Sequence, residues 1–278
     1  MIVRVPASSA NIGPGFDALG MALSLYAEVA AVGEGEQPPD TGHVVETTHP
    51  ADIAFRRAGG DGQLWVRSPI PSGRGLGFSG AVRVGAVVAA YLQRCDGDVE
   101  SVWAHRPEML RLAAELEGHA DNVAASMYGG VVAVADDRVV SVPLRLDPAV
   151  VVWIPSFTTS TDQSRTALSG AVPFADAVFN VGRTAVLVAA LAAGDIDALA
   201  DATQDRLHQP LRFGPAAPSH EACEAALAAG AWCAWLSGSG PTVAAMCAVD
   251  DAEALVAQMP GDGHCKVLRI DHAGVTVE

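Results

Sequence analysis

The chain has 278 residues, of which 50% are hydrophobic and 18% are charged, so it can bury a substantial core in one large domain or two packed ones. Its 17 basic and 32 acidic side chains give a net charge of −15, which argues against a nucleic-acid binder, because such a protein needs a basic surface. No apolar run reaches the roughly 18 residues of a membrane span, and residues 1–6 lack the pattern of a signal peptide. We therefore expect a cytoplasmic protein without nucleic-acid or membrane partners, and we allow for a homodimer.

Strands and helices are mixed along the chain without strict alternation, which favours an α+β fold over a doubly wound parallel sheet. Apolar and β-branched stretches predict strands at residues 2–5, 25–32, 63–68, 131–135, 139–142, 150–155, 232–236, 243–249 and 266–270. Apolar residues at helical spacing predict helices at residues 79–94, 107–117, 175–193, 196–207 and 219–229, with a short helix ending at 129–130. No linker interrupts the pattern, so we expect two packed domains, 1–146 and 147–278.

The number and spacing of the cysteines indicate whether disulfides or zinc hold the fold together. Five cysteines, an odd number without CxxC spacing, argue against a disulfide framework or a structural zinc site. Isolated cysteines in apolar stretches are usually small core residues, so a catalytic thiol is disfavoured.

A glycine-rich loop between a predicted strand and a predicted helix carries the first functional signal. Residues 71–81 read PSGRGLGFSGA. Glycine lets the backbone approach a ligand closely, and the following helix directs unpaired N–H groups at the loop. The pattern predicts a phosphate site. An ordinary glycine-rich turn that caps a helix would show the same pattern. The segment is not a Walker loop, because the only lysine is Lys266, and no βαβ unit makes it a dinucleotide fingerprint.

Two further polar clusters strengthen the signal. Residues 115–122 read ELEGHADN, where a carboxylate could hold Mg²⁺, a hard ion that prefers oxygen ligands. A helix C-cap at Gly118 and an N-cap at Asp121 would explain part of that cluster. Residues 236–242 read LSGSGPT and lie between two apolar stretches, where a tight hairpin is the simplest interpretation of this turn taken alone.

Three stretches in this order resemble the motifs of the GHMP kinase superfamily: PASSANIGPGFD at 6–17, the glycine loop at 71–81 and SGSGPT at 237–242. Within the superfamily, SSANIGPGFD, EGHADN at 117–122 and DRLHQPLR at 205–212 resemble the homoserine kinase family. The resemblance covers nearly the whole chain. It implies an N-terminal domain similar to ribosomal protein S5 domain 2 and a C-terminal ferredoxin-like domain, with ATP over the glycine loop and the substrate between the domains.

The resemblance also implies roles for single residues. The ATP-phosphate loop would consist of Pro71, Ser72, Gly73, Arg74, Gly75, Leu76, Gly77, Phe78 and Ser79. The Mg²⁺ ligands would be Ser79 and Glu117. The homoserine pocket would be lined by Asn11, Asp17, His119, Asn122, Thr161, Arg165 and Arg212. Two arginines suit an amino acid carboxylate, because the guanidinium fork binds it bidentately.

Three of these residues are the candidate catalytic residues: Asn122 to hold the hydroxyl in line, with Asp17 and His119 as possible bases. Asp17 also suits the substrate ammonium, and that pairing would make it a poor base. One departure from the family pattern is Phe78, which stands where the family usually has serine and adds bulk near the nucleotide.

The implied reaction is phosphoryl transfer from ATP to the side-chain hydroxyl of L-homoserine, giving O-phospho-L-homoserine on the route to threonine. Two alternatives stay open at this point. One is a kinase for pantoate or another hydroxy acid, and the other is a non-catalytic protein of the same fold that binds a metabolite.

Overall fold

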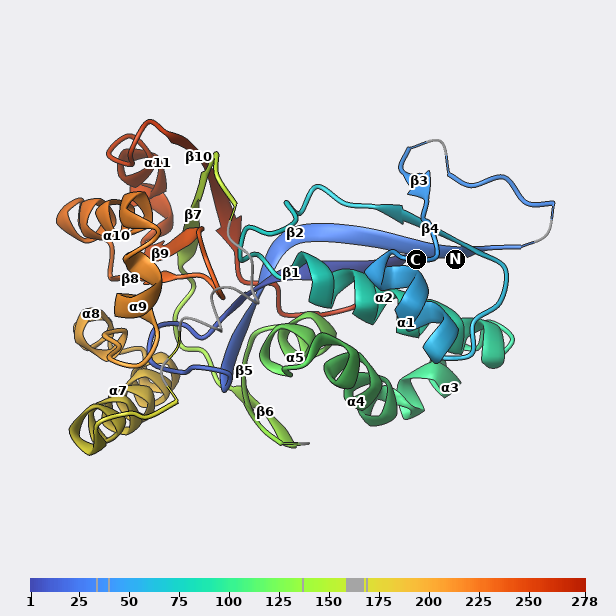
Figure 1. The fold of residues 1–278 in the computed structure, drawn as a ribbon, viewed down its shortest axis with the longest axis horizontal. Helices are drawn as coiled ribbons and strands as arrows, with labels where there is room; N and C mark the ends of the chain where they lie inside the picture. The colour runs from blue at the N-terminus through green and yellow to red at the C-terminus, as the bar shows by residue number, and fades with distance from the viewer. Residues whose placement is uncertain (34, 40, 137, 159–167, 169) are drawn as a thin grey trace.

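The computed structural model describes residues 1–33, 35–39, 41–136, 138–158, 168 and 170–278, which form two sheets with helices packed against them (Figure 1). Within the described residues the first sheet has seven strands in the order β11-β1-β2-β4-β3, with β5 paired to β2 and β6 to β5. These strands are β1 (Val3–Ala10), β2 (Leu19–Val32), β3 (His43–Val44), β4 (Gln63–Arg67), β5 (Val131–Ala135), β6 (Arg138–Val142) and β11 (Thr276–Val277).

The second sheet has the order β10-β7-β9-β8. Its strands are β7 (Ala149–Pro155), β8 (Cys233–Leu236), β9 (Val243–Cys247) and β10 (Gly263–Arg269). The strand pairs of both sheets are antiparallel. The α+β class expected from the sequence is therefore confirmed.

The helices of the first half lie together against the first sheet (Figure 1). They are α1 (Pro50–Arg57), α2 (Phe78–Arg94), α3 (Val99–Ala104), α4 (Arg106–Glu117) and α5 (Asp121–Tyr128). The central helix α2 packs closely on β1 and β2 because its interior Gly85 has no side chain. A Cβ at that position would lie 2.6 Å from Val29 and 3.0 Å from Val5. This close packing holds the start of α2, and with it the glycine loop, against the sheet.

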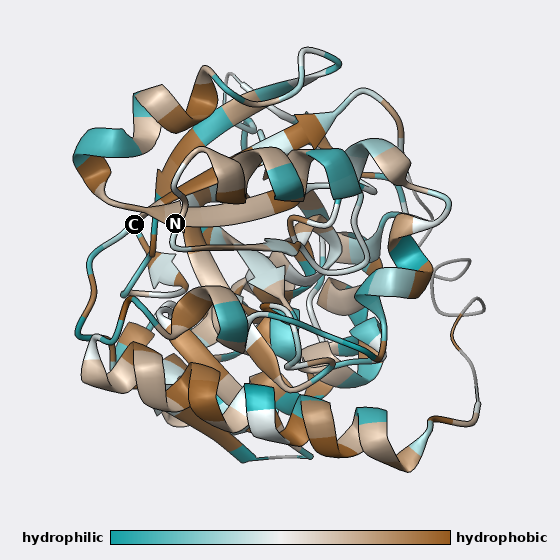
Figure 2. Cartoon of the chain, turned by 90° about the vertical axis from the view of Figure 1, so that its left-hand side faces the viewer, coloured by the Kyte–Doolittle hydropathy of each residue, from teal (hydrophilic) through white to brown (hydrophobic). Residues whose placement is uncertain are grey.

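The helices of the second half are α7 (Phe174–Ala193), α8 (Leu199–Ala202), α9 (Gln209–Phe213), α10 (Ala217–Ala228) and α11 (Ala252–Val256). Helix α7, the long helix along the lower edge of Figure 2, carries much hydrophobic colour. By length and composition it is the one helix of the described chain that could cross a membrane, with 22% of its most apolar stretch buried. One such helix is weak evidence for a membrane span, and Leu187 and Leu191 bury its inner face in the protein core.

One hydrophobic cluster joins the two halves. Val150, Val152 and Trp235 on one face of the second sheet pack in the same cluster as Val5 and Leu23 of the first sheet. The opposite face of the second sheet packs with α10 and α11 in a separate, smaller cluster. The halves therefore share a core, as the lack of a linker predicts.

The helix predicted at residues 196–207 is wrong. Only Leu199–Ala202 is helical there, and a second short helix begins at Gln209. The carboxylate of Asp205 accepts the backbone N–H groups of Leu207 and His208 at 3.0 and 2.9 Å, which satisfies them outside a helix. The short helices α1, α3 and α11 were not predicted at all.

Burial should make two of the five cysteines unreactive. The five are free thiols, and desolvation raises the pKa of Cys223 and of Cys233 to about 12. We expect an aromatic disulfide reagent to modify the partly exposed Cys95 and Cys265 in the folded protein, and Cys223 and Cys233 only after denaturation. Mass spectrometry of the labelled peptides checks this, and rapid labelling of Cys233 in the folded protein would contradict it.

Candidate active site

One pocket collects most of the residues that the sequence predicts for the site. Its lining comes from both halves of the chain. The predicted residues that line it are Asn11, Asp17, Pro71, Ser72, Gly73, Arg74, Gly75, Gly77, Phe78, Ser79, Glu117, His119, Asn122 and Arg212. Leu76 is the exception in the loop, because its side chain is fully buried in the core. Thr161 and Arg165 lie outside the described residues.

The glycine loop leads directly into the start of α2. Gly73, Gly75 and Gly77 have φ of 66°, 75° and 67°, the left-handed region that favours glycine. Gly77 is the N-cap of α2 and offers no side chain to its first turn, which contains Ser79. The uncapped N–H groups and the positive end of the helix dipole are thus directed at the pocket, which suits phosphate.

The third motif braces this loop from the second sheet. The hydroxyl of Ser237 donates to the backbone oxygen of Gly75 at 2.6 Å and lies 2.8 Å from the hydroxyl of Ser9. The indole N–H of Trp235 donates to the same Ser9 hydroxyl at 2.9 Å. The sequence alone predicts a simple hairpin for this turn, and the structure shows that it also holds the glycine loop.

The Arg74 side chain is held by the backbone at the end of β7. Its guanidinium donates to the backbone oxygen of Pro155 and, at 2.9 Å, to that of Ser156. These bonds tie the glycine loop to the end of β7. Arg74 lines the pocket but its charged group is committed to the scaffold.

Phe78 packs beside the loop. Its ring is partly buried against the core and meets the ring of His49 edge-on, with centroids 6.1 Å apart. His49 in turn caps α1, because its Nδ1 accepts the backbone N–H of Ala51 at 3.1 Å. The Phe78 ring therefore contacts the N-cap residue of α1 and also lines the pocket.

Ser79 and Glu117 meet as the prediction of a metal site requires. The Ser79 hydroxyl donates to the Glu117 carboxylate at 2.9 Å, which brings two hard oxygen donors together beside the glycine loop. No group of three or more His, Cys, Asp or Glu side chains that could hold a metal occurs in the described part of the chain. A hydroxyl and one carboxylate nevertheless fit Mg²⁺, which typically binds through one or two carboxylates, substrate phosphates and water. Arg83, which the sequence analysis did not single out, contacts both oxygens.

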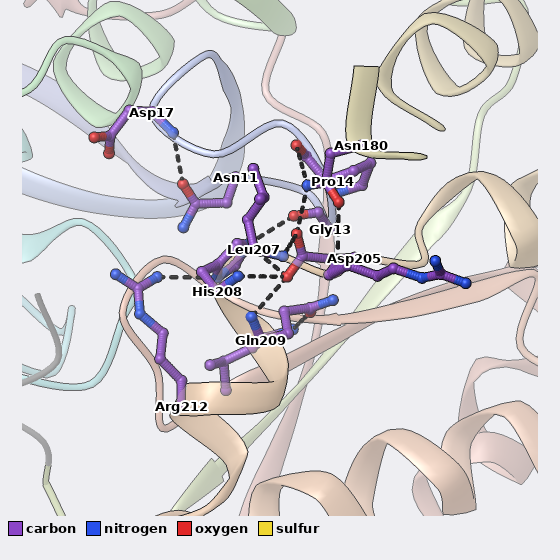
Figure 3. A network of polar contacts seen from close by, with 12 residues as sticks. Asn11, Gly13, Pro14, Asp17, Asn180, Asp205, Leu207, His208, Gln209 and Arg212 are labelled. Carbon is purple, nitrogen blue, oxygen red and sulfur yellow. Dashed lines mark hydrogen bonds and ion pairs between the residues drawn. The ribbon is translucent and has the colours of Figure 1, made fainter. Parts of the chain in front are cut away.

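The first motif forms a strained loop between β1 and β2. Asn11, Ile12 and Asp17 have positive φ of 72°, 46° and 54°, which is unusual without glycine and is often found at functional sites. The Asn11 amide holds the loop, since its Nδ2 donates to the backbone oxygen of Gly238 at 2.9 Å and its Oδ1 accepts the Asp17 N–H at 3.0 Å. Figure 3 shows the Asp17 carboxylate turned away from this bond.

Arg212 is positioned by a histidine that the sequence analysis did not name as a site residue. Its Nη1 donates to Nδ1 of His208 at 3.1 Å (Figure 3). The same Nη1 donates to the Gly238 backbone oxygen at 3.0 Å. The Nε2–H of His208 donates to the Gly13 backbone oxygen at 2.7 Å, so both ring nitrogens have fixed roles. Burial lowers the pKa of His208, which keeps the imidazole neutral beside the arginine.

A second layer of polar contacts supports this arrangement. Asn180 of α7 donates to the Asp205 carboxylate at 2.6 Å and accepts the backbone N–H of Arg206 at 2.9 Å (Figure 3). Thr184 of the same helix donates to the backbone oxygen of Pro14 at 3.1 Å. Helix α7 therefore links the first motif to the segment that carries His208 and Arg212.

The polar cluster at residues 115–122 also lines the pocket. Gly118 ends α4 with φ of 86°, as predicted, but Asp121 is the first residue of α5 and Ala120 is the cap. Nδ1 of His119 lies 3.0 Å from the nearly fully buried Asp121 carboxylate, which places the acceptor lone pair of the ring on Nε2. Asn122 is held by Ser8, whose hydroxyl donates to the amide oxygen at 2.8 Å.

The uncapped start of α2, beside a pocket that Asp17 and Arg212 also line, suits a ligand with phosphate groups together with a small charged substrate. The family model described as "GHMP kinases N terminal domain" matches residues 43–130, and "GHMP kinases C terminal" matches residues 187–264. The chain is 43% identical to a homoserine kinase of Moorella thermoacetica over 265 residues, which cover 88% of this chain and 87% of that one.

A second curated relative and a solved structure are also homoserine kinases. A homoserine kinase of Gloeobacter violaceus is 40% identical over 92% of this chain and 90% of its own length. The crystal structure of homoserine kinase from Cytophaga hutchinsonii superposes with a TM-score of 0.84 at 26% identity, covering 100% of this chain and 97% of that one. The chain belongs to the homoserine kinase family of the GHMP kinases.

Proposed function

We infer that this chain transfers the γ-phosphoryl group of ATP to the side-chain hydroxyl of L-homoserine, giving ADP and O-phospho-L-homoserine. The observation that carries this inference is a single pocket with two chemically distinct ends. The uncapped start of α2 at Gly77 suits the phosphates, and Asp17 with Arg212 suits the ammonium and carboxylate of an amino acid. The two curated relatives, matched over 87% and 90% of their length, are named homoserine kinase.

Phosphoryl transfer asks the protein mainly to position the reactants and to stabilise charge. We propose that the backbone N–H groups of residues 77–79 bind phosphate oxygens, and that Asn122, held by Ser8, orients the attacking hydroxyl. His119, oriented by Asp121, would take the hydroxyl proton on Nε2 as the new O–P bond forms and ADP leaves. Asp17 would be committed to the substrate ammonium.

Ser79 and Glu117 are the residues that we propose to hold Mg²⁺, supported by the 2.9 Å contact between their oxygens. When bound, the metal ion would neutralise the negative charge that builds up on the phosphates. Thr161 and Arg165 stay predicted substrate contacts. The domain division at residue 146, the homodimer and the cytoplasmic location also stay predictions. The division is supported by the sheets, since of the first-sheet strands only β11 follows that residue.

A substrate panel with Asp17→Asn tests the reaction. We expect ADP release with homoserine to exceed that with mevalonate, pantoate or shikimate, and Asp17→Asn to raise the KM for homoserine by about 10²-fold, because an ionic contact in a pocket contributes ~2–5 kcal/mol. Asp147→Asn is the control, since Asp147 is exposed and pairs with Arg269 away from the pocket. Turnover of another alcohol in place of homoserine, unaffected by Asp17→Asn, would show that the substrate is a plain hydroxy compound.

A further inference from the structure

Arg83 carries a permanent positive charge to the place where the metal ion of the nucleotide is expected to bind. It lies one helical turn after Ser79 on α2, and helix side chains lean towards the N-terminus, so its guanidinium reaches back to the start of the helix. Its Nη1 donates both to the Ser79 hydroxyl and to the Glu117 carboxylate. The contact is well shielded, because the side chains of Arg83 and Glu117 are 18% and 9% exposed.

These contacts and metal binding exclude one another. The oxygens of Ser79 and Glu117 lie 2.9 Å apart, and a Mg²⁺ ion bound by both would stand about 2.1 Å from each. Nη1 now contacts the same two atoms, so an ion bound by both would meet the guanidinium. An arginine does not lose its proton in a protein, so the guanidinium cannot become a neutral neighbour of the ion.

The guanidinium is nevertheless held in a way that lets it move. The contacts described for it are all made by Nη1, and its buried Nε has no hydrogen-bond partner among the described residues. An unsatisfied buried donor disfavours the present position of the side chain. A cation that binds the Glu117 carboxylate would therefore displace the Arg83 guanidinium, which already lacks a hydrogen-bond partner for its Nε.

We propose that Arg83 competes with the divalent metal ion for Glu117 and Ser79, so that the metal ion enters together with the nucleotide rather than alone. In the free protein the charge of Glu117 is already balanced by Arg83. A bare divalent cation has to break this pair and then stand beside a guanidinium. The phosphates of a bound nucleotide add negative charge at the start of α2, and this favours exchanging the guanidinium for the metal ion.

Arg83→Met tests the proposal, because methionine keeps an unbranched stem and removes the charge. The readout is the Kd of Mn²⁺, measured by the electron paramagnetic resonance of free Mn²⁺, without nucleotide and with saturating ADP. Without nucleotide we expect Arg83→Met to bind Mn²⁺ at least about tenfold more tightly than the unmodified protein, since even ~1.4 kcal/mol from removing an adjacent positive charge is a factor of ten. With ADP the difference should shrink.

Arg94→Met is the matched control. Arg94 is the last residue of the same helix, so the variant changes the net charge equally while leaving the glycine loop untouched. It should leave the Kd of Mn²⁺ unchanged. Adding Glu117→Gln to Arg83→Met should abolish the gain, because the carboxylate is the group that the two cations share.

Mn²⁺ affinity that is equal or weaker in Arg83→Met would overturn the proposal; weaker ADP binding with unchanged Mn²⁺ binding would instead make Arg83 a phosphate ligand. Melting curves of each variant confirm that it is folded. The proposal rests on the proposed function for the identity of the nucleotide and for the metal site at Ser79 and Glu117. If the protein does not phosphorylate homoserine, the proposed reaction is refuted and the Mn²⁺ result still stands. If Arg83→Met leaves the Mn²⁺ affinity unchanged, the proposed role of Arg83 is refuted even when the protein is an active kinase.

Discussion

Gly75→Ala is expected to reduce ATP-dependent turnover by at least about 10²-fold, because displacing a positioned group by roughly 1 Å can have an effect of that size. A Cβ at residue 75 would overlap the backbone oxygen of Ser237 and lie 3.0 Å from that of Gly240, so the glycine loop or the third motif has to move. The φ of 75° adds strain for any residue with a side chain. The affinity for a non-hydrolysable ATP analogue, measured by calorimetry, should fall together with kcat/KM.

Gly230→Ala separates this effect from backbone strain alone. Gly230 follows α10 with a φ of 93°, and a Cβ there would meet nothing within 4 Å. This control should lower the melting temperature slightly, since a residue forced to positive φ costs of order 1–3 kcal/mol, and should keep full activity. If Gly75→Ala were as active as Gly230→Ala, the glycine loop would not be the phosphate site.

Arg212→Met is expected to raise the KM for homoserine by about 10² to 10³-fold and to change the KM for ATP little, because truncating a buried charged partner costs ~2–5 kcal/mol. Arg212 is 5% exposed, and His208 and Gly238 direct its guanidinium into the substrate end of the pocket. The variant should also be less stable, since His208 Nδ1 loses a donor in a buried place. Initial-rate kinetics with each substrate varied in turn give the two KM values.

Arg206→Met provides the comparison for Arg212. Arg206 lies in the same segment, but its side chain is 53% exposed and it pairs with Asp176 on α7. Removing this surface charge should leave both KM values within about twofold, because exposed ion pairs contribute ~1 kcal/mol at most. Equal kinetic effects in the two variants would show that Arg212 acts through the fold and not through the substrate.

Local patterns predicted the parts of the site that are local in the chain. The glycine loop and the helix after it are contiguous in the chain, so their pattern predicted either a phosphate site or an ordinary helix-capping turn. The partners of that loop could not be predicted in the same way. Ser237 is 162 residues from Gly75, and His208 is 195 residues from the Gly13 oxygen that fixes its tautomer. Only tertiary packing brings these atoms together.

Other differences have local physical causes. An arginine on a helix usually faces water, so nothing in the pattern singled out Arg83 before its contact with Glu117 was seen. The helix expected over residues 196–207 has suitable apolar spacing, but the Asp205 carboxylate captures the backbone N–H groups that such a helix would continue through. For Arg74 the sequence correctly gave its position in the loop, and only the structure shows that its charge is used by the carbonyl oxygens of residues 155 and 156.

The turn at residues 237–240 has a mechanical consequence for the two ends of the pocket. The Gly238 backbone oxygen accepts hydrogen bonds from both Asn11 and Arg212. The hydroxyl of the adjacent Ser237 donates to the backbone oxygen of Gly75. Nucleotide and amino acid would thus rest on opposite sides of one short piece of backbone. The ligand that binds first would order the backbone of residues 237–240, which the other ligand also contacts. Each ligand should therefore lower the dissociation constant of the other by the same factor.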